Sequence, residues 1–191
     1  MLASCDKKSN NLTAKEKDLA YTTSFYENKV SLIEQDTPKI IKKLQQKGVK
    51  LIGYTSVLVN PHKSISNKML FKFRENLQKI GLDFTAHSLP TRVKPLHSLP
   101  RYFNDYPTFY HGLLSANGKY NRNVDDRSVL EEFLYSLTRS KVGGATYQPK
   151  IIIFVSSEIE KIHSIEKQIS NMQFSIDFIG IQYLNNFFYL I

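Results

Sequence analysis

The stretch "KIIIFVSSEIEKIHSIEKQI", residues 150–169, decides the fold. An aliphatic run ends on Ser156 and Ser157, and a helical pattern follows at once. The run predicts a buried strand over 150–155, and isoleucines at helical spacing predict a helix after it. That apolar stripe comprises Ile159, Ile162, Ile165 and Ile169. Side chains at such a strand end often face a ligand, so function depends on what the two serines do.

The rest of the chain alternates between helical and strand patterns. Helices are predicted over 13–28, 38–47, 125–139 and from Ser64 or Ser66 to Ile80; strands are predicted over 49–55 and 174–184. A hairpin is predicted over 109–120 with Asn117-Gly118 as its turn. The helical side chains expected inside are Leu19, Ala20, Phe25, Ile40, Ile41, Leu44, Ile65, Met69, Phe73, Leu77, Ile80, Val129, Leu130, Phe133, Leu134 and Leu137.

This alternation predicts an α/β fold, with a mainly parallel sheet and helices on both of its faces. Residues 1–12 are polar and predict a mobile tail, and residues 13–191 predict a single domain. Within that domain, residues 88–107 carry four prolines and predict a long irregular segment.

Composition excludes several classes of protein. A hydrophobic fraction of 41% is typical of a globular chain. No apolar run approaches the ~18 residues of a transmembrane helix. The single cysteine, Cys5, allows no internal disulfide and no cysteine cluster for zinc. Residues 2–5, "LASC", resemble the end of a lipoprotein signal but have only Met1 before them, so we interpret the match as chance. The sequence leaves the localisation open between a cytoplasmic chain and, if a signal peptide is missing from this start, an exported one.

The net charge of +9 is unevenly distributed. Residues 38–101 hold thirteen Lys or Arg and two acids, Glu75 and Asp83, which gives +11, and the rest of the chain sums to −2. Such a stretch can bind phosphate, nucleic acid or anionic lipid. The simpler interpretation is that these cations line the solvent faces of two helices. No sequence motif for nucleic-acid recognition supports the binding alternative.

Two blocks resemble a known family. "DTPKIIKKLQQKGVKLIGYTS" (36–56) resembles the second motif of haloacid dehalogenase-like (HAD-like) phosphohydrolases, and residues 149–183 resemble their fourth motif and closing strand. The likeness extends over about 30–183 and is closest to an uncharacterised bacterial subgroup of that superfamily. It implies a Rossmann-like three-layer sandwich and Mg²⁺-dependent phosphoryl transfer through an aspartyl-phosphate.

The resemblance also implies site residues. Thr55 and Ser56 match the second motif, with the Thr55 hydroxyl facing the phosphate. The position of the family's lysine falls near Asp126 or Arg127, so Lys119 or Arg122 would have to substitute for it in offsetting the phosphate charge. The alternative role for Thr55 is structural: at the end of a strand, its hydroxyl would hydrogen-bond to the backbone instead of to phosphate. The first motif, a strand ending in D-x-D, is absent from this sequence. Because that strand lies centrally in the family's sheet, we expect strands 49–55 and 150–155 to become neighbours.

At the fourth motif, Ser156, Ser157 and Glu158 stand where the family holds Mg²⁺ with two aspartates. A serine can cap a helix as well as an aspartate does, and Ser157 with Glu160 fits a capping box. Mg²⁺ needs carboxylates, which a neutral hydroxyl does not replace. We therefore regard this as a degenerate metal motif and expect no cofactor. The histidines show no metal-ligand spacing, and His163 is expected in solvent.

Three hypotheses follow. The first is a HAD-like domain without phosphatase activity, either degenerate or lacking its N-terminal part. The second is a Mg²⁺-dependent phosphohydrolase that uses substitute residues. The third is a binding module whose basic surface, with Lys68, Lys72 and Lys79, takes nucleic acid or another anionic ligand.

Overall fold

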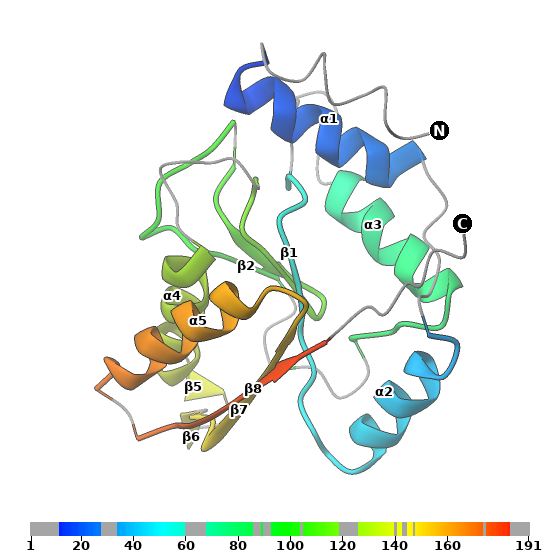
Figure 1. The fold of residues 1–191 in the computed structure, drawn as a ribbon. Helices are drawn as coiled ribbons and strands as arrows, with labels where there is room; N and C mark the ends of the chain where they lie inside the picture. Colours follow the sequence, from blue (N-terminus) through cyan, green and yellow to red (C-terminus); the bar gives the residue numbers. More distant parts are fainter. Residues whose placement is uncertain are drawn as a thin grey trace. The chain divides into compact units, whose positions relative to one another are not determined.

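The computed structural model describes residues 12–27, 34–59, 68–85, 89, 93–103, 105–118, 126–139, 141–142, 145–146, 148–173 and 175–183 (Figure 1). The chain divides into two compact units, Met1–Val129 and Leu130–Ile191, called here the N-terminal and C-terminal units. A single domain over 13–191 stays a prediction. The predicted tail lies outside the described residues except for Leu12.

The N-terminal unit contains one four-stranded sheet and three helices. Its elements are α1 (Ala14–Glu27), α2 (Thr37–Gln46), β1 (Gly53–Thr55), α3 (Lys68–Lys79), β2 (Val93–Pro95), β3 (Thr108–Tyr110) and β4 (Leu113–Ser115). The strand order is β1-β4-β3-β2, in which β1 is parallel to β4 and the other pairs are antiparallel. The α/β class is confirmed, but the sheet is mixed rather than mainly parallel, because the hairpin β3–β4 and the edge strand β2 add antiparallel pairs.

Two segments of this unit differ in detail from what the sequence predicts. The segment 88–107, expected to be irregular, contains β2; its Pro95 is tolerated because β2 is an edge strand. The hairpin exists, but its turn is His111-Gly112, with φ of 47° and 88°. Two residues with positive φ make the type of tight turn that matches strand twist. Asn117-Gly118 instead follows the end of β4.

The core of the N-terminal unit forms where α3 packs on the sheet. Val59, Leu70, Leu77 and Leu113 are buried together. Phe73, Ile80, Leu82, Phe84 and Tyr110 pack against them. The apolar stripe predicted for α3 is therefore confirmed at Phe73, Leu77 and Ile80, while Ile65 lies outside the described residues.

The apolar stripe of α2 is not buried, contrary to the prediction. Ile40 is 53% exposed, Leu44 is also exposed, and Ile41 is half-buried. The buried residue of α2 is Gln45, whose Nε2 donates to the carbonyl of Asp83 at 2.6 Å. A polar anchor thus holds this helix, and its aliphatic side chains face outward.

Helix α1 also buries polar residues where apolar ones were expected. Asp18 and Thr22 are fully buried, one helical turn apart, whereas Leu19 is half-buried and Ala20 is exposed. The side chain of Phe25 lies outside the described residues. The helix lies beside α3 (Figure 1).

The C-terminal unit is built on a two-stranded parallel sheet. Its elements are the main part of α4 (Asp126–Arg139), β5 (Lys141–Val142), β6 (Ala145–Thr146), β7 (Ile151–Ser156), α5 (Ile159–Ser170) and β8 (Asp177–Gln182). Strands β7 and β8 pair in parallel, β5 and β6 pair antiparallel, and α5 packs on β7 and β8 (Figure 1). The isoleucine stripe is confirmed: Ile162, Ile165 and Ile169 are buried, while Ile159 is exposed. In α4, Val129, Phe133, Leu134 and Leu137 are buried as predicted, and Leu130 is half-buried.

Strands β1 and β7 are not paired with each other within the described residues, and the expectation that they become neighbours stays a prediction. Each has a parallel partner within its own unit: β4 for β1 and β8 for β7. The two strands belong to separate sheets. Of the helices in the described parts of the chain, none combines the length and the apolarity needed to cross a membrane.

Candidate functional site

The predicted phosphate-binding residues lie at the carboxyl end of β1. Because β1 and β4 are parallel, with Thr55 opposite Ser115, both strands end at the same edge of the sheet. Parallel strand ends are where α/β proteins commonly place ligands. The side chains of Thr55 and Ser56 are half-buried there.

Asn117 ties together the segments that meet at this edge. Its side chain is buried; Oδ1 accepts from the amide of Val59 at 2.9 Å, and Nδ2 donates to the carbonyls of Tyr102 and Asp105 at 3.0 and 2.7 Å. Its φ of 56° is a conformation that asparagine tolerates better than most residues. One side chain therefore satisfies three backbone groups from distant parts of the sequence.

The hydroxyl groups at this edge also bond to backbone. Ser115 is buried; its Oγ donates to the carbonyl of Val57 at 2.5 Å and accepts from the amide of Asn117 at 3.0 Å. Oγ1 of Thr55 accepts from the amide of Val57, and Oγ1 of Thr22 accepts from the amide of Leu58, both at 3.2 Å. The Thr55 hydroxyl thus has the structural role considered as its alternative, and its proton is left for donation.

Ser56 contributes its backbone to the same arrangement. Its carbonyl accepts from the amide of Gly118 at 3.0 Å. Lys119 follows immediately but lies outside the described residues, so its role at a phosphate stays a prediction.

A buried carboxylate beside this edge was not anticipated. Asp18 on α1 lies next to Tyr102 and Gly118: a Cβ added at Gly118 would lie 3.0 Å from Oδ2 of Asp18 and 2.8 Å from Cε1 of Tyr102. Burial raises the pKa of the Tyr102 phenol, and the neighbouring Asp18 carboxylate raises it further. The only sequence signal was the polar pair Asp18 and Thr22 at helical spacing, in a helix with few aliphatic residues.

The serine pair lies in the C-terminal unit, at the carboxyl end of β7. Oγ of Ser156 accepts from the amide of Glu158 at 3.1 Å. Helix α5 begins at Ile159, and its N-cap residue is Glu158, without a side-chain capping bond. The predicted capping box of Ser157 and Glu160 is therefore wrong, because the chain enters the helix one residue later than expected.

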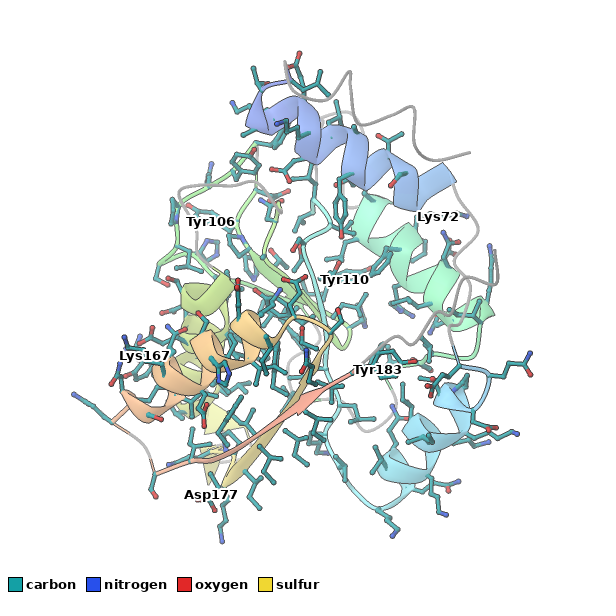
Figure 2. All side chains as sticks on the ribbon, viewed as in Figure 1. Lys72, Tyr106, Tyr110, Lys167, Asp177 and Tyr183 are labelled. Carbon is teal, nitrogen blue, oxygen red and sulfur yellow. The ribbon has the colours of Figure 1, made fainter. Side chains whose placement is uncertain are left out.

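Backbone bonds fix the loop that carries the serines. The carbonyl of Ser156 accepts from the amide of Tyr183 at 2.9 Å, and the carbonyl of Ser157 accepts from Nε2 of Gln182 at 3.4 Å. Tyr183 follows the end of β8, and Asp177 marks its beginning (Figure 2). Among the described residues, no three His, Cys, Asp or Glu side chains are grouped closely enough to hold a metal ion.

A pair of alanine variants tests which serine supports the loop. Replacing Ser156 removes the acceptor of the Glu158 amide and is expected to lower the free energy of unfolding by about 0.5–1 kcal/mol. Ser157→Ala is expected to stay within about 0.5 kcal/mol of the parent chain, as for an ordinary surface substitution. Urea unfolding measures both, and a larger loss in Ser157→Ala would contradict the assignment.

Comparisons with known proteins give a family but no activity. The chain is 27% identical over 177 residues to an uncharacterized protein of Rickettsia conorii, covering 92% of this chain and 55% of the relative. It is 22% identical over 157 residues to an uncharacterized protein of Rickettsia bellii, and 27% identical over 158 residues to one of Rickettsia typhi. Each of these two matches covers 82% of this chain and 49% of the relative. The chain thus spans about half the length of these relatives. No solved structure matches it.

A family model also matches residues 3–186, nearly the whole chain. The chain therefore belongs to the family described as "Protein of unknown function (DUF2608)".

Proposed function

We propose that this chain is a HAD-like α/β domain that does not hydrolyse phosphate esters by itself. One observation carries the proposal: at the end of β7, where HAD-like enzymes hold Mg²⁺ with carboxylates, Ser156 uses its hydroxyl to accept the amide of Glu158. Mg²⁺ is usually held by one or two carboxylates together with water and substrate phosphates. A neutral hydroxyl engaged by the backbone supplies no charge to offset the cation.

The arrangement at the end of β1 supports the same proposal. The Thr55 hydroxyl accepts one backbone amide, which leaves its proton to donate to an anionic group. Such a donor could help bind a phosphate but cannot act as a nucleophile in the way that an aspartate does. The edge is therefore suited to binding an anionic ligand rather than to transferring a phosphoryl group.

An assay for phosphate release tests the proposal. We expect hydrolysis of p-nitrophenyl phosphate with Mg²⁺ to stay at the level of buffer, and Thr55→Ala to leave that level unchanged. Calorimetric titration with Mg²⁺ should give no saturable heat, because Ser156 and Ser157 offer the ion no carboxylate at the end of β7. Turnover that requires Mg²⁺, disappears with a chelator and is lost in Thr55→Ala would establish the second hypothesis, a phosphohydrolase with substitute residues.

The third hypothesis, a basic binding surface, makes a different prediction. Part of the charge on α2 and α3 is already compensated: Lys72 lies 3.4 Å from Glu75, and Lys39 lies 2.8 Å from Asp36 (Lys72 is labelled in Figure 2). Nucleic-acid binding through this surface would weaken steeply with salt and would fall when Lys72 and Lys79 are neutralised. Neutralising Lys167 on α5, in the other unit, is the matched control.

A further inference from the structure

Helix α1 is bound to the chain segments that leave β1 and β4, and it uses polar side chains from one of its faces. Lys15, Asp18 and Thr22 are three and four positions apart, so they lie along one side of the helix. Oγ1 of Thr22 accepts from the amide of Leu58, just beyond the end of β1. In Figure 1 the chain that leaves β1 runs up to α1.

Asp18 brings a negative charge to the segment that leaves β4. A Cβ added at Gly118 would lie 3.0 Å from Oδ2 of Asp18, and the amide of Gly118 donates to the carbonyl of Ser56 at 3.0 Å. Gly118 thus links the carboxylate to Ser56, which has Thr55 beside it. Asp18 is also fully buried. A buried charge repels a second anion more strongly than an exposed one does, because little water screens it.

The loop before β3 completes the contact of α1. Burial and the Asp18 carboxylate both raise the pKa of the Tyr102 phenol, so the phenol stays neutral and keeps its proton beside the carboxylate. Nζ of Lys15 lies 5.8 Å from the centre of the Phe103 ring. Helix α1 therefore contacts three segments that are far apart in the sequence, and all three meet at the carboxyl ends of β1 and β4.

The docking of α1 is polar, unlike that of α3. Among the described side chains of α1, the buried ones are Asp18 and Thr22, whereas α3 buries Leu70 and Leu77 in the core. Apolar burial supplies most of the free energy that holds elements together, and a hydrogen bond exchanged for one with water contributes little. Elements with few buried apolar contacts are the ones that open locally. We therefore expect α1 to leave this edge more readily than α3 leaves the core.

We propose that α1 is a strap that closes the ligand-binding edge of β1 and β4, and that Asp18 excludes anions until the strap lifts. This inference rests on the proposed function, in which the edge binds an anionic ligand through groups such as the Thr55 hydroxyl. It adds the regulation of that site: phosphate or a phosphate monoester binds the form in which α1 has left the edge. The bound ligand then shifts the population toward this open form.

Hydrogen–deuterium exchange of the full chain tests the strap. The probe is inorganic phosphate, added at constant ionic strength. At about ten times the Kd of the open form, phosphate should raise the exchange rate of Ala14–Glu27 about tenfold, because a ligand that binds one form stabilises it by the factor 1 + [L]/Kd. The control is α3, whose exchange should not change. Thr55→Ala should abolish the effect of phosphate, since it removes a ligand-facing hydroxyl.

Two variants separate the charge of Asp18 from the closure by α1. Asp18→Asn keeps the shape of the side chain and removes its charge, and it should tighten phosphate binding at least about tenfold in an NMR titration. Thr22→Val keeps the charge and removes the acceptor that Thr22 offers to the Leu58 amide. It should speed the exchange of α1 even without phosphate, because water can satisfy that amide once the helix has left.

Each variant has a matched control. Asp36→Asn removes an exposed carboxylate that pairs with Lys39, and Thr23→Val changes the half-buried threonine next to Thr22; neither should alter phosphate binding or the exchange of α1. Circular dichroism verifies folding, and if Asp18→Asn does not fold, Thr22→Val alone decides the test.

The results that would overturn the proposal are distinct. Phosphate that binds the parent chain through Thr55 and leaves the exchange of α1 unchanged would overturn the strap and keep the anionic edge. Absence of phosphate binding in every variant, although Thr22→Val opens α1, would overturn the inference through its premise, the anionic edge. Catalytic inactivity is tested separately by the release of phosphate from p-nitrophenyl phosphate.

Discussion

Replacing Asn117 by alanine is expected to lower the free energy of unfolding by about 2–3 kcal/mol. The buried amide of Val59 loses its acceptor, Oδ1 of Asn117. The carbonyls of Tyr102 and Asp105 each lose one donor but keep another, because each also accepts the backbone amide of the other residue. A buried polar group without a partner costs about 1–3 kcal/mol. Alanine is also less favourable than asparagine at a φ of 56°. Urea unfolding followed by circular dichroism measures the loss.

Two further variants separate the causes of that loss. Asn117→Gly tolerates the positive φ and removes only the hydrogen bonds, so it should retain most of the destabilisation. Asn171→Ala changes an exposed asparagine just after α5, with an ordinary φ of −87°, and should cost less than about 0.5 kcal/mol. A loss below about 1 kcal/mol in Asn117→Ala would show that water or other groups satisfy these backbone atoms.

Gly112→Ala is expected to destabilise the N-terminal unit by at least about 2 kcal/mol. Gly112 has a φ of 88° in the turn between β3 and β4, and a Cβ there would collide with the backbone carbonyl of Phe84. A backbone neighbour yields less easily than the end of a flexible side chain, so strain spreads into the hairpin and the segment that packs on it. Thermal or urea unfolding measures the effect.

The chain provides a matched control for this variant. Gly48 has a similar φ of 81°, but a Cβ added to it meets nothing within 4 Å. Gly48→Ala therefore reports the conformational penalty alone, about 1 kcal/mol. The difference between the two variants measures the close approach of Phe84. Equal losses would mean that the hairpin shifts to accommodate the added methyl group.

Local spacing was sufficient to predict most helices and strands of this protein. The helices α3, α4 and α5 and the strands β7 and β8 appear where apolar periodicity indicated them, because that periodicity reflects the face that each element buries. The turn of the hairpin was misplaced for a local reason. Asn-Gly is a strong turn signal, but His111-Gly112 forms the turn. The side chain of Asn117 instead accepts a hydrogen bond from the backbone amide of Val59.

The candidate site could be predicted only in part. Thr55, Ser56, Ser156 and Ser157 do lie at strand ends, which depends on local sequence. The partners of Asn117 could not be inferred, because Val59 is 58 positions away in the sequence. The same holds for Asp18 and Tyr102, which only folding brings to Gly118.

Apolar periodicity indicates that a side chain can be buried, but it does not say by what. The stripes of α2 and β7 are as aliphatic as that of α5, yet α5 buries its isoleucines while Ile40 and Ile153 stay exposed. The sequence by itself determined which segments become helices and strands, because backbone conformation and side-chain periodicity are local properties. Only the tertiary structure decided which faces are covered and which polar groups meet, because burial and hydrogen bonding depend on segments far apart in the chain.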